Sequence, residues 1–197
     1  MKDRIKKVRE RVNLYIEVTD LISVSRRYFI IGFFDGVLTV LGLIIGSHIS
    51  GEISARLIIT AGVATALALG ISSSWGAYEA ERIEQKIMKD QKERALLVNS
   101  RESSIDRAHR FAAYVSSIIH GISPIIGAIL PISPYAFLPL DEAFVASLTI
   151  GFASLFILGA FMGKMAGYNI FVSGFRMFLA GVLTALIVIF LSPIHFI

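Results

Sequence analysis

An acidic residue, Asp35, lies within a long apolar segment of this chain, Tyr28–Ile49. An ionised carboxylate left alone in hydrocarbon costs several kcal/mol, so it must be paired, protonated or bound to a cation. An acidic side chain in a membrane-spanning helix is therefore a functional candidate, with a proton or a metal ion as its expected occupant.

The composition requires a membrane environment. Of the 197 residues, 55% are hydrophobic, and the mean hydropathy is +0.71, which is too apolar for a soluble domain. Each of five runs is long enough to cross about 30 Å of hydrocarbon as a helix of roughly 20 residues. These runs are Tyr28–Ile49, Leu57–Tyr78, Phe111–Ile132, Ala143–Gly163 and Ile170–Leu191.

The expected fold is an all-α membrane protein with five transmembrane helices. The runs are too long, and alternate too little, for barrel strands. One transmembrane domain, 28–197, is expected, with a helical connection over 79–107. Residues 1–27 are predicted to form an amphipathic helix on the membrane surface, with Ile5, Val8, Val12 and Tyr15 on its apolar face.

The distribution of Lys and Arg predicts the orientation. Residues 1–27 and 79–110 carry eight each, residues 164–176 carry two, and the connections on the other side contribute only Arg56. Positive residues are enriched on the cytoplasmic side of membrane proteins. The N-terminus and the 79–107 connection are thus predicted to be cytoplasmic and the C-terminus outside. The pI near 9.5 reflects this topology, and we expect no nucleic-acid partner.

Several function classes lack support in the sequence. The chain has no cysteine, so thiolate metal sites, iron–sulfur clusters and disulfides are excluded. No hydrolase triad, phosphate-binding loop or zinc-protease motif is present, so we expect no enzyme and no bound cofactor. The first apolar run lacks the features of a cleavable signal and is expected to remain.

Small residues and prolines pattern the spanning helices. The second predicted helix has a four-residue ladder of Gly62, Ala66, Gly70 and Ser74, and the fourth has Gly159, Gly163 and Gly167. Such ladders allow helix backbones to approach closely. In the third helix, Pro124 is expected to free a carbonyl and bend the helix, and Pro131 and Pro134 are expected to end it.

Other residues are candidates for an ion pathway, each with a simpler alternative. Gly36 leaves room beside Asp35 for an ion or a water. Glu79 and Glu81 are metal candidates at the cytoplasmic mouth, or belong to a solvated charged face. His120 is a proton-relay or metal candidate, or makes a polar interhelical contact.

These motifs make the chain resemble the vacuolar iron transporter family. The family's first helix carries an Arg, an apolar stretch and an Asn-Asp-Gly motif, which here run from Arg27 to Phe34-Asp35-Gly36, with Phe34 in place of the Asn. The third-helix motif, from Gly-Ile-Ser to Leu-Pro-x-x-Pro, is matched by Gly121–Pro134. A Ser-Gly-x-Arg-Met pattern is matched at Ser173–Met177.

The resemblance implies a proton-coupled exporter of Fe²⁺ or Mn²⁺ with Asp35 as the transport-site carboxylate. It also implies a homodimer in which the two Asp35 residues face each other at a two-fold axis. Facing carboxylates suit a hard or borderline divalent cation and are expected to share a proton when the metal is absent. The metal is then the transported substrate.

The second helix departs from the family pattern. The family's Met position falls on Ser73, and its Gly-Glu-Tyr motif falls on Gly76, Ala77 and Tyr78. Glu79 and Glu81 follow nearby and are expected on other faces of the helix. Ser73 is expected to shift the preference toward manganese, because a hydroxyl is a harder ligand than a thioether.

Two alternatives stay open: a non-transporting membrane scaffold of the same fold, and a transporter of another cation. The compact length favours a prokaryotic plasma membrane.

Overall fold

The computed structural model describes residues 12, 14–51, 54–96 and 104–191, and all regular structure in them is helical. Within these residues, five helices are long and apolar enough to cross a membrane, which confirms the prediction of an all-α chain with five helices of spanning length. The elements are α2 (Leu21–Ile49), α3 (Ala55–Leu96), α4 (Ser104–Ile132), the short 3-10 helix η1 (Ser133–Ala136), α5 (Leu140–Ala166) and α6 (Ile170–Phe190).

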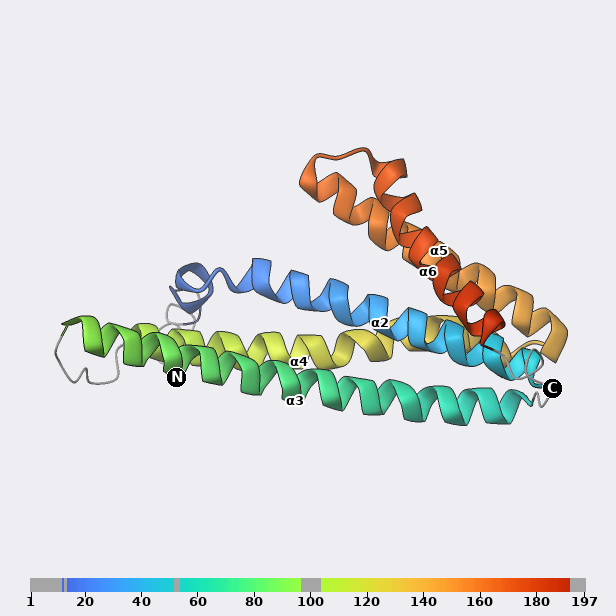
Figure 1. Cartoon of the computed structure of the whole chain (residues 1–197), viewed down its shortest axis with the longest axis horizontal. Coiled ribbons are helices and arrows are strands. Elements are labelled where there is room, and N and C mark those ends of the chain that lie inside the picture. Colours follow the sequence, from blue (N-terminus) through green and yellow to red (C-terminus); the bar gives the residue numbers. More distant parts are fainter. Residues whose placement is uncertain (1–11, 13, 52–53, 97–103, 192–197) are drawn as a thin grey trace, which may run out of the picture.

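Helices α2, α3 and α4 form an elongated bundle, and α5 and α6 form a hairpin that diverges from it (Figure 1). Helix α4 packs closely against both α2 and α3, whereas α5 packs chiefly against α6. The hairpin meets the bundle near the end of α2 and separates from it toward the start of α2 (Figure 1). The fold therefore leaves one side of α2 without a closely packed neighbour over its first turns.

We call the end of the bundle where α2 and α4 begin, and where α3 ends, the charged end. Helix α3 continues beyond the apolar run to Leu96 as one helix of 42 residues, so part of the 79–107 connection extends the bundle at this end. Residues 97–103 lie outside the described residues. Which side of a membrane the charged end faces stays a prediction.

The N-terminal amphipathic segment falls partly outside the described residues, which exclude Ile5 and Val8. In the described part, residues 14–18 are helical, and the ring of Tyr15 lies 5.9 Å from that of Phe111 on α4. Leu14 and Val18 are exposed. This part of the segment thus contacts the bundle through Tyr15, and its apolar side chains Leu14 and Val18 face outward.

The closest contact between α2 and α4 is at Gly36 and Pro124. A Cβ atom added to Gly36 would overlap the carbonyl oxygen of Pro124 and lie 2.7 Å from its Cα atom. One turn earlier, a Cβ at Gly32 would overlap the hydroxyl of Ser123, and on α4 a Cβ at Gly127 would overlap the carbonyl oxygen of Phe33. The missing side chains let the two backbones meet directly.

This contact corrects one expectation. The space beside Gly36 is filled by the backbone of α4, so Gly36 offers no room for an ion or a water. Its role in the fold is close approach between helices. Helix α4 meanwhile stays helical through Pro124 and Pro131 and ends at Ile132, and η1 follows from Ser133 with Pro134 near its start.

The ladder on α3 allows close approach to another helix, as predicted, and the structure shows that this helix is α4. A Cβ at Gly62 would meet Ile132, one at Gly70 would meet the carbonyl oxygen of Gly121, and Ser74 lies against Gly121. Ala66 is only 2% exposed. Small residues on both helices thus set the distance between α3 and α4.

The predicted ladder on α5 is right for two of its three glycines. Gly159 and Gly163 lie against Ser173 of α6. A Cβ atom added to Gly167 would meet no atom of another helix within 4 Å, and the residue has φ +71°. It caps the C-terminus of α5. Glycine tolerates this left-handed conformation at little cost, so the turn between α5 and α6 explains Gly167 better than packing does.

The Gly36–Pro124 contact predicts a difference between two glycines of the same helix. Gly36→Ala is expected to lower the free energy of unfolding by about 1–3 kcal/mol, because the new methyl group overlaps backbone that cannot rotate away. Gly42→Ala is the matched control, because its Cβ would lie 3.8 Å from Val188, an ordinary contact. Thermal unfolding in detergent measures both, and equal stability of the two variants would contradict the packing described here.

Candidate ion pathway

Asp35 lies on α2 directly before Gly36, so the tight crossing with α4 fixes its position. The residue is half-buried. Among the described residues, its carboxylate has no hydrogen-bond or ion-pair partner, although the imidazole of His120 is close enough to interact with it electrostatically. A carboxylate in this setting retains its capacity to bind a proton or a cation.

The side of α2 that carries Asp35 is open in a single chain. Ile31, one turn before Asp35, is 45% exposed, and Thr39, one turn after it, is also exposed. Residues four apart lie on the same side of a helix. A further group can therefore approach Asp35 from outside the described helices.

His120 joins α4 to α2 by a hydrogen bond. Its Nδ1 atom lies 3.0 Å from the carbonyl oxygen of Tyr28. A carbonyl oxygen only accepts, so Nδ1 must carry the proton, and in the neutral ring Nε2 then keeps a free lone pair. This bond orients the imidazole and leaves its second nitrogen able to accept a proton or a metal.

The carbonyl oxygen of His120 lies at the same crossing. Pro124, four residues later, has no N–H to donate to it, and the hydroxyl of Ser123 donates to it instead at 3.0 Å. Pro124 thus frees the carbonyl of His120 from the backbone pattern, as the sequence predicts, but the hydroxyl of Ser123 occupies this carbonyl. Pro124 contributes to the site by its close packing with α2.

Tyr28 connects this cluster to α3. Its hydroxyl donates to Oε1 of Glu81 at 3.0 Å, its ring centroid lies 4.9 Å from that of His120, and the guanidinium of Arg27 lies 5.6 Å from the same ring. Tyr28 also lies seven residues before Asp35, which is two helical turns and hence the same side of α2. Polar groups thus extend from Glu81 through Tyr28 and His120 toward Asp35.

The position of Glu81 corrects the expectation from the sequence. Glu81 follows Ala77 by four residues, or about 40° around the helix, so the two share one face of α3. Ala77 is 8% exposed and so faces the bundle. The chain therefore carries a carboxylate on the inward face of α3, one turn from the position of the family's Glu.

Glu79 does not join this cluster. It pairs with Arg82 at 3.4 Å, and the side chains of both are substantially exposed, so in this structure it belongs to a solvated surface. In the described residues, no three His, Asp or Glu side chains are close enough to hold one metal ion. A single chain thus does not bring Asp35, Glu79 and Glu81 together, and their assignment as metal ligands stays a prediction.

The other two candidates on α3, Tyr78 and Ser73, make no hydrogen bond with Glu81 among the described residues. The hydroxyl of Tyr78 donates to that of Tyr114 at 3.2 Å, with ring centroids 4.8 Å apart. Tyr114 is 54% exposed, so this pair lies toward the outside of the α3–α4 contact. Ser73 is half-buried, and its role also stays a prediction.

Similarity to known proteins identifies the family. The sequence model of the VIT family matches residues 26–103 and 79–192. The chain belongs to the VIT family. An uncharacterized protein of Methanocaldococcus jannaschii is 36% identical over 168 residues, covering 84% of this chain and 86% of that protein. At family level, VIT membership implies a multi-pass membrane transporter of metal ions.

The hydrogen bond between Tyr28 and Glu81 predicts energetic coupling between α2 and α3. Tyr28→Phe and Glu81→Gln, made singly and together, are expected to give a coupling energy of about 0.5–1.5 kcal/mol, because interhelical hydrogen bonds in membrane proteins contribute about this much. Chemical unfolding of the four proteins in detergent measures this energy. Tyr78→Phe is the matched control and is expected to show no coupling to Glu81→Gln; coupling of similar size at both tyrosines would contradict the assignment.

Proposed function

We propose that this VIT-family protein exports Fe²⁺ or Mn²⁺ from the cytoplasm in exchange for protons. The observation that carries the proposal is the Asp35 carboxylate, which lies inside a spanning helix without a hydrogen-bond or ion-pair partner among the described residues. Such a group binds a cation or holds a proton. Competition between the two for one carboxylate is the elementary step of an exchanger.

A homodimer supplies the rest of the binding site in this proposal. One chain offers too few ligands near Asp35 to hold a divalent ion within the described residues, and the exposed Ile31 leaves this side of α2 accessible. A second copy related by a two-fold axis would place its own carboxylate opposite. Two carboxylates, completed by water or carbonyl oxygens, suit Mn²⁺ and Fe²⁺.

The surrounding residues then have distinct roles. Glu81 attracts the cation at the charged end, which we take as cytoplasmic from the distribution of Lys and Arg. Tyr28 holds Glu81 in place through its hydroxyl. His120, oriented by its bond to the Tyr28 carbonyl, accepts or returns the proton that the metal displaces from Asp35.

The direct test is transport by purified protein in proteoliposomes under an imposed pH gradient. Wild type is expected to move Fe²⁺ or Mn²⁺ only when the gradient is present. Asp35→Asn is expected to reduce the rate to that of empty vesicles while the protein keeps its helical content and unfolding temperature, because an amide cannot exchange a proton for the metal. Asp141→Asn, an exposed acid at the start of α5, is the matched control and is expected to transport normally.

Metal movement unaffected by Asp35→Asn would contradict the proposed site. Absence of movement by the wild type for either metal, under gradients of both signs, would instead favour the alternatives: a scaffold that keeps the fold, or a transporter of another cation. Ser73 and Ala77 at the family's Met and Glu positions are the specific observation that keeps these alternatives in view.

The metal preference generates a second prediction. Ser73→Met restores a soft thioether at the position where the family has one, so it is expected to raise transport of Fe²⁺ relative to Mn²⁺. Competition between the two ions in the same vesicles measures this ratio. An unchanged ratio would remove Ser73 from the pathway.

The proposed location is a prokaryotic plasma membrane. In this setting the proton gradient points inward, so proton entry can drive export of the metal. The sidedness follows from the positive charge on the N-terminal segment and on the α3–α4 connection. Vesicles with protein in one known orientation would show it directly.

A further inference from the structure

Arg176 is a charged residue that the ion pathway described above leaves unexplained. The five apolar runs contain one acidic residue, Asp35, and one residue that is always positively charged near neutral pH, Arg176. Arg176 is the seventh residue of α6, about 9 Å along the helix from Ile170. A guanidinium at this depth is costly unless it finds a partner or reaches the headgroups. Its position therefore requires a physical reason.

Arg176 has no polar partner in this structure. Its side chain is exposed, and among the described residues it makes no hydrogen bond and no ion pair. The Asp35 carboxylate on α2 is likewise without a hydrogen-bond or ion-pair partner. One acid and one base thus lie unpaired inside spanning helices of the same chain, where charged groups usually pair with one another.

The contact between α2 and α6 lies in line with both charges. A Cβ atom added to Gly42 would lie 3.8 Å from Val188 of α6. Asp35 precedes Gly42 by seven residues, which is two turns, so both lie on the same side of α2. Arg176 precedes Val188 by three steps of four residues, so both belong to one ridge of α6. The members of this ridge between them are half-buried: Ala180 and Thr184.

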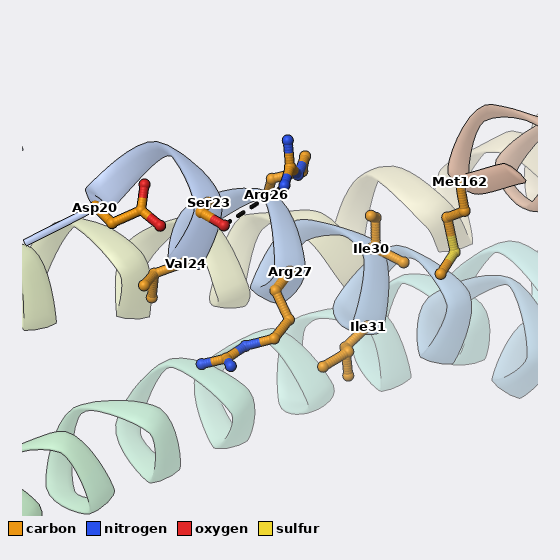
Figure 2. Close-up of a pocket in the computed structure, with 8 residues that line it drawn as sticks. All are labelled: Asp20, Ser23, Val24, Arg26, Arg27, Ile30, Ile31 and Met162. Carbon is orange, nitrogen blue, oxygen red and sulfur yellow. Dashed lines mark hydrogen bonds between the residues drawn. The ribbon is translucent and has the colours of Figure 1, made fainter. Parts of the chain in front are cut away.

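Helix α5 shows that the two charges lie at a similar level along the bundle. Met162 of α5 reaches toward Ile31, one turn before Asp35 (Figure 2). The next residue of α5 is a glycine that lies against Ser173, about one turn before Arg176. The same turn of α5 thus lies between the residues that precede the two charges. Asp35 and Arg176 are therefore separated mainly across the space between α2 and α6.

The angle of the hairpin sets the width of this space. Helices α5 and α6 pack chiefly against each other, and they meet α2 near its end and diverge toward the charged end (Figure 1). Such an arrangement allows the hairpin to rotate as a unit about its contact with α2. Rotation toward α2 would bring Arg176 to Asp35.

We propose that Arg176 is the counter-charge of Asp35, with which it forms an ion pair when the hairpin closes on α2 and no metal ion is bound. This inference rests on the proposed function, because it gives a partner to the same carboxylate. In the two-subunit site, one shared proton and one guanidinium replace the two positive charges of the departing metal ion. The guanidinium therefore competes with the metal for Asp35.

Titration of the purified full chain in detergent with Mn²⁺ at one fixed pH, followed by calorimetry, tests the competition. Arg176→Gln is expected to bind Mn²⁺ about tenfold more tightly than wild type, because a charged partner within about 6 Å changes the ligand affinity of a carboxylate by this factor or more. Transport by the same variant is expected to slow, because the empty site lacks its counter-charge. Arg176→Lys, which keeps the charge, is expected to bind nearly as wild type does.

The matched control removes a charge from the same hairpin. Lys164 is exposed in the last turn of α5, and Lys164→Gln is expected to leave both Mn²⁺ affinity and transport unchanged. Tighter binding combined with slower transport separates a counter-charge from a residue that only supports the fold, whose loss would weaken both.

Cross-linking tests the approach of the two helices without any metal. The chain has no cysteine, so Ile31→Cys and Ser173→Cys introduce the only two thiols and keep both charges. A short bifunctional thiol reagent is expected to join them within one chain of metal-free protein. Adding Arg176→Gln or Asp35→Asn is expected to slow this reaction about fivefold, because the closed state is then less populated. Adding Lys164→Gln is expected to leave the rate unchanged.

The outcomes separate this inference from the proposed function. Wild-type or weaker Mn²⁺ affinity in Arg176→Gln, or a cross-linking rate independent of both charges, would overturn the ion pair. Cross-links formed between two chains would overturn pairing within one chain. If wild type binds no Mn²⁺ while the cross-linking rate still depends on both charges, the proposed function fails and the ion pair stands.

Discussion

The direct backbone contact between α2 and α4 at Gly36 and Pro124 determines most of the functional geometry. Lipid gives helices no hydrophobic driving force toward one another, so association depends on close packing and interhelical hydrogen bonds. The glycines of α2 bring the carbonyl of Tyr28 within reach of His120 on α4. They also hold Asp35 beside the crossing. The position of the proposed ion site is thus a consequence of a helix contact that only glycine permits.

The polar groups near this contact are unevenly satisfied. Tyr28 and His120 make hydrogen bonds that join α2 to α3 and α4, whereas Asp35 has no such bond among the described residues. Hydrogen-bonded groups fix the positions of helices, and a carboxylate without a partner keeps its affinity for a cation or a proton. Tyr28 and His120 thus fix the helices relative to one another, whereas Asp35 is the residue proposed to exchange a proton for a metal ion.

The sequence predicted the elements well because membrane helices are specified by local composition. The five apolar runs correspond to five long helices in the described residues, and the Gly62–Ser74 ladder makes a close helix contact as expected, with α4 as its partner. The errors arose where a neighbouring helix decides the outcome. Gly36 appeared to leave space, yet Pro124 from a segment nearly ninety residues away fills it. Gly167 appeared to continue a ladder, yet the chain turns there.

The candidate site was predictable only in part for the same reason. Asp35 is evident from its own segment, because any acid in such a run requires an explanation. The relation of Glu81 to Ala77 follows from helical spacing alone and was misjudged, whereas the bond from Tyr28 to Glu81 depends on how α2 and α3 meet. Membership of the VIT family indicates, at family level, that the protein transports metal ions. The proposed choice of metal and the proposed coupling to protons go beyond the family, because they rest on particular residues such as Ser73, where this chain departs from the family pattern.

The central claim is that one carboxylate binds either a proton or a metal ion. Addition of Mn²⁺ to the purified protein in weakly buffered detergent solution, with pH and free Mn²⁺ recorded together, tests it most directly. We predict that wild type binds Mn²⁺ and releases protons in a fixed ratio, and that Asp35→Asn loses both signals while remaining folded. Proton release and Mn²⁺ binding of wild-type size by Asp35→Asn would contradict the account.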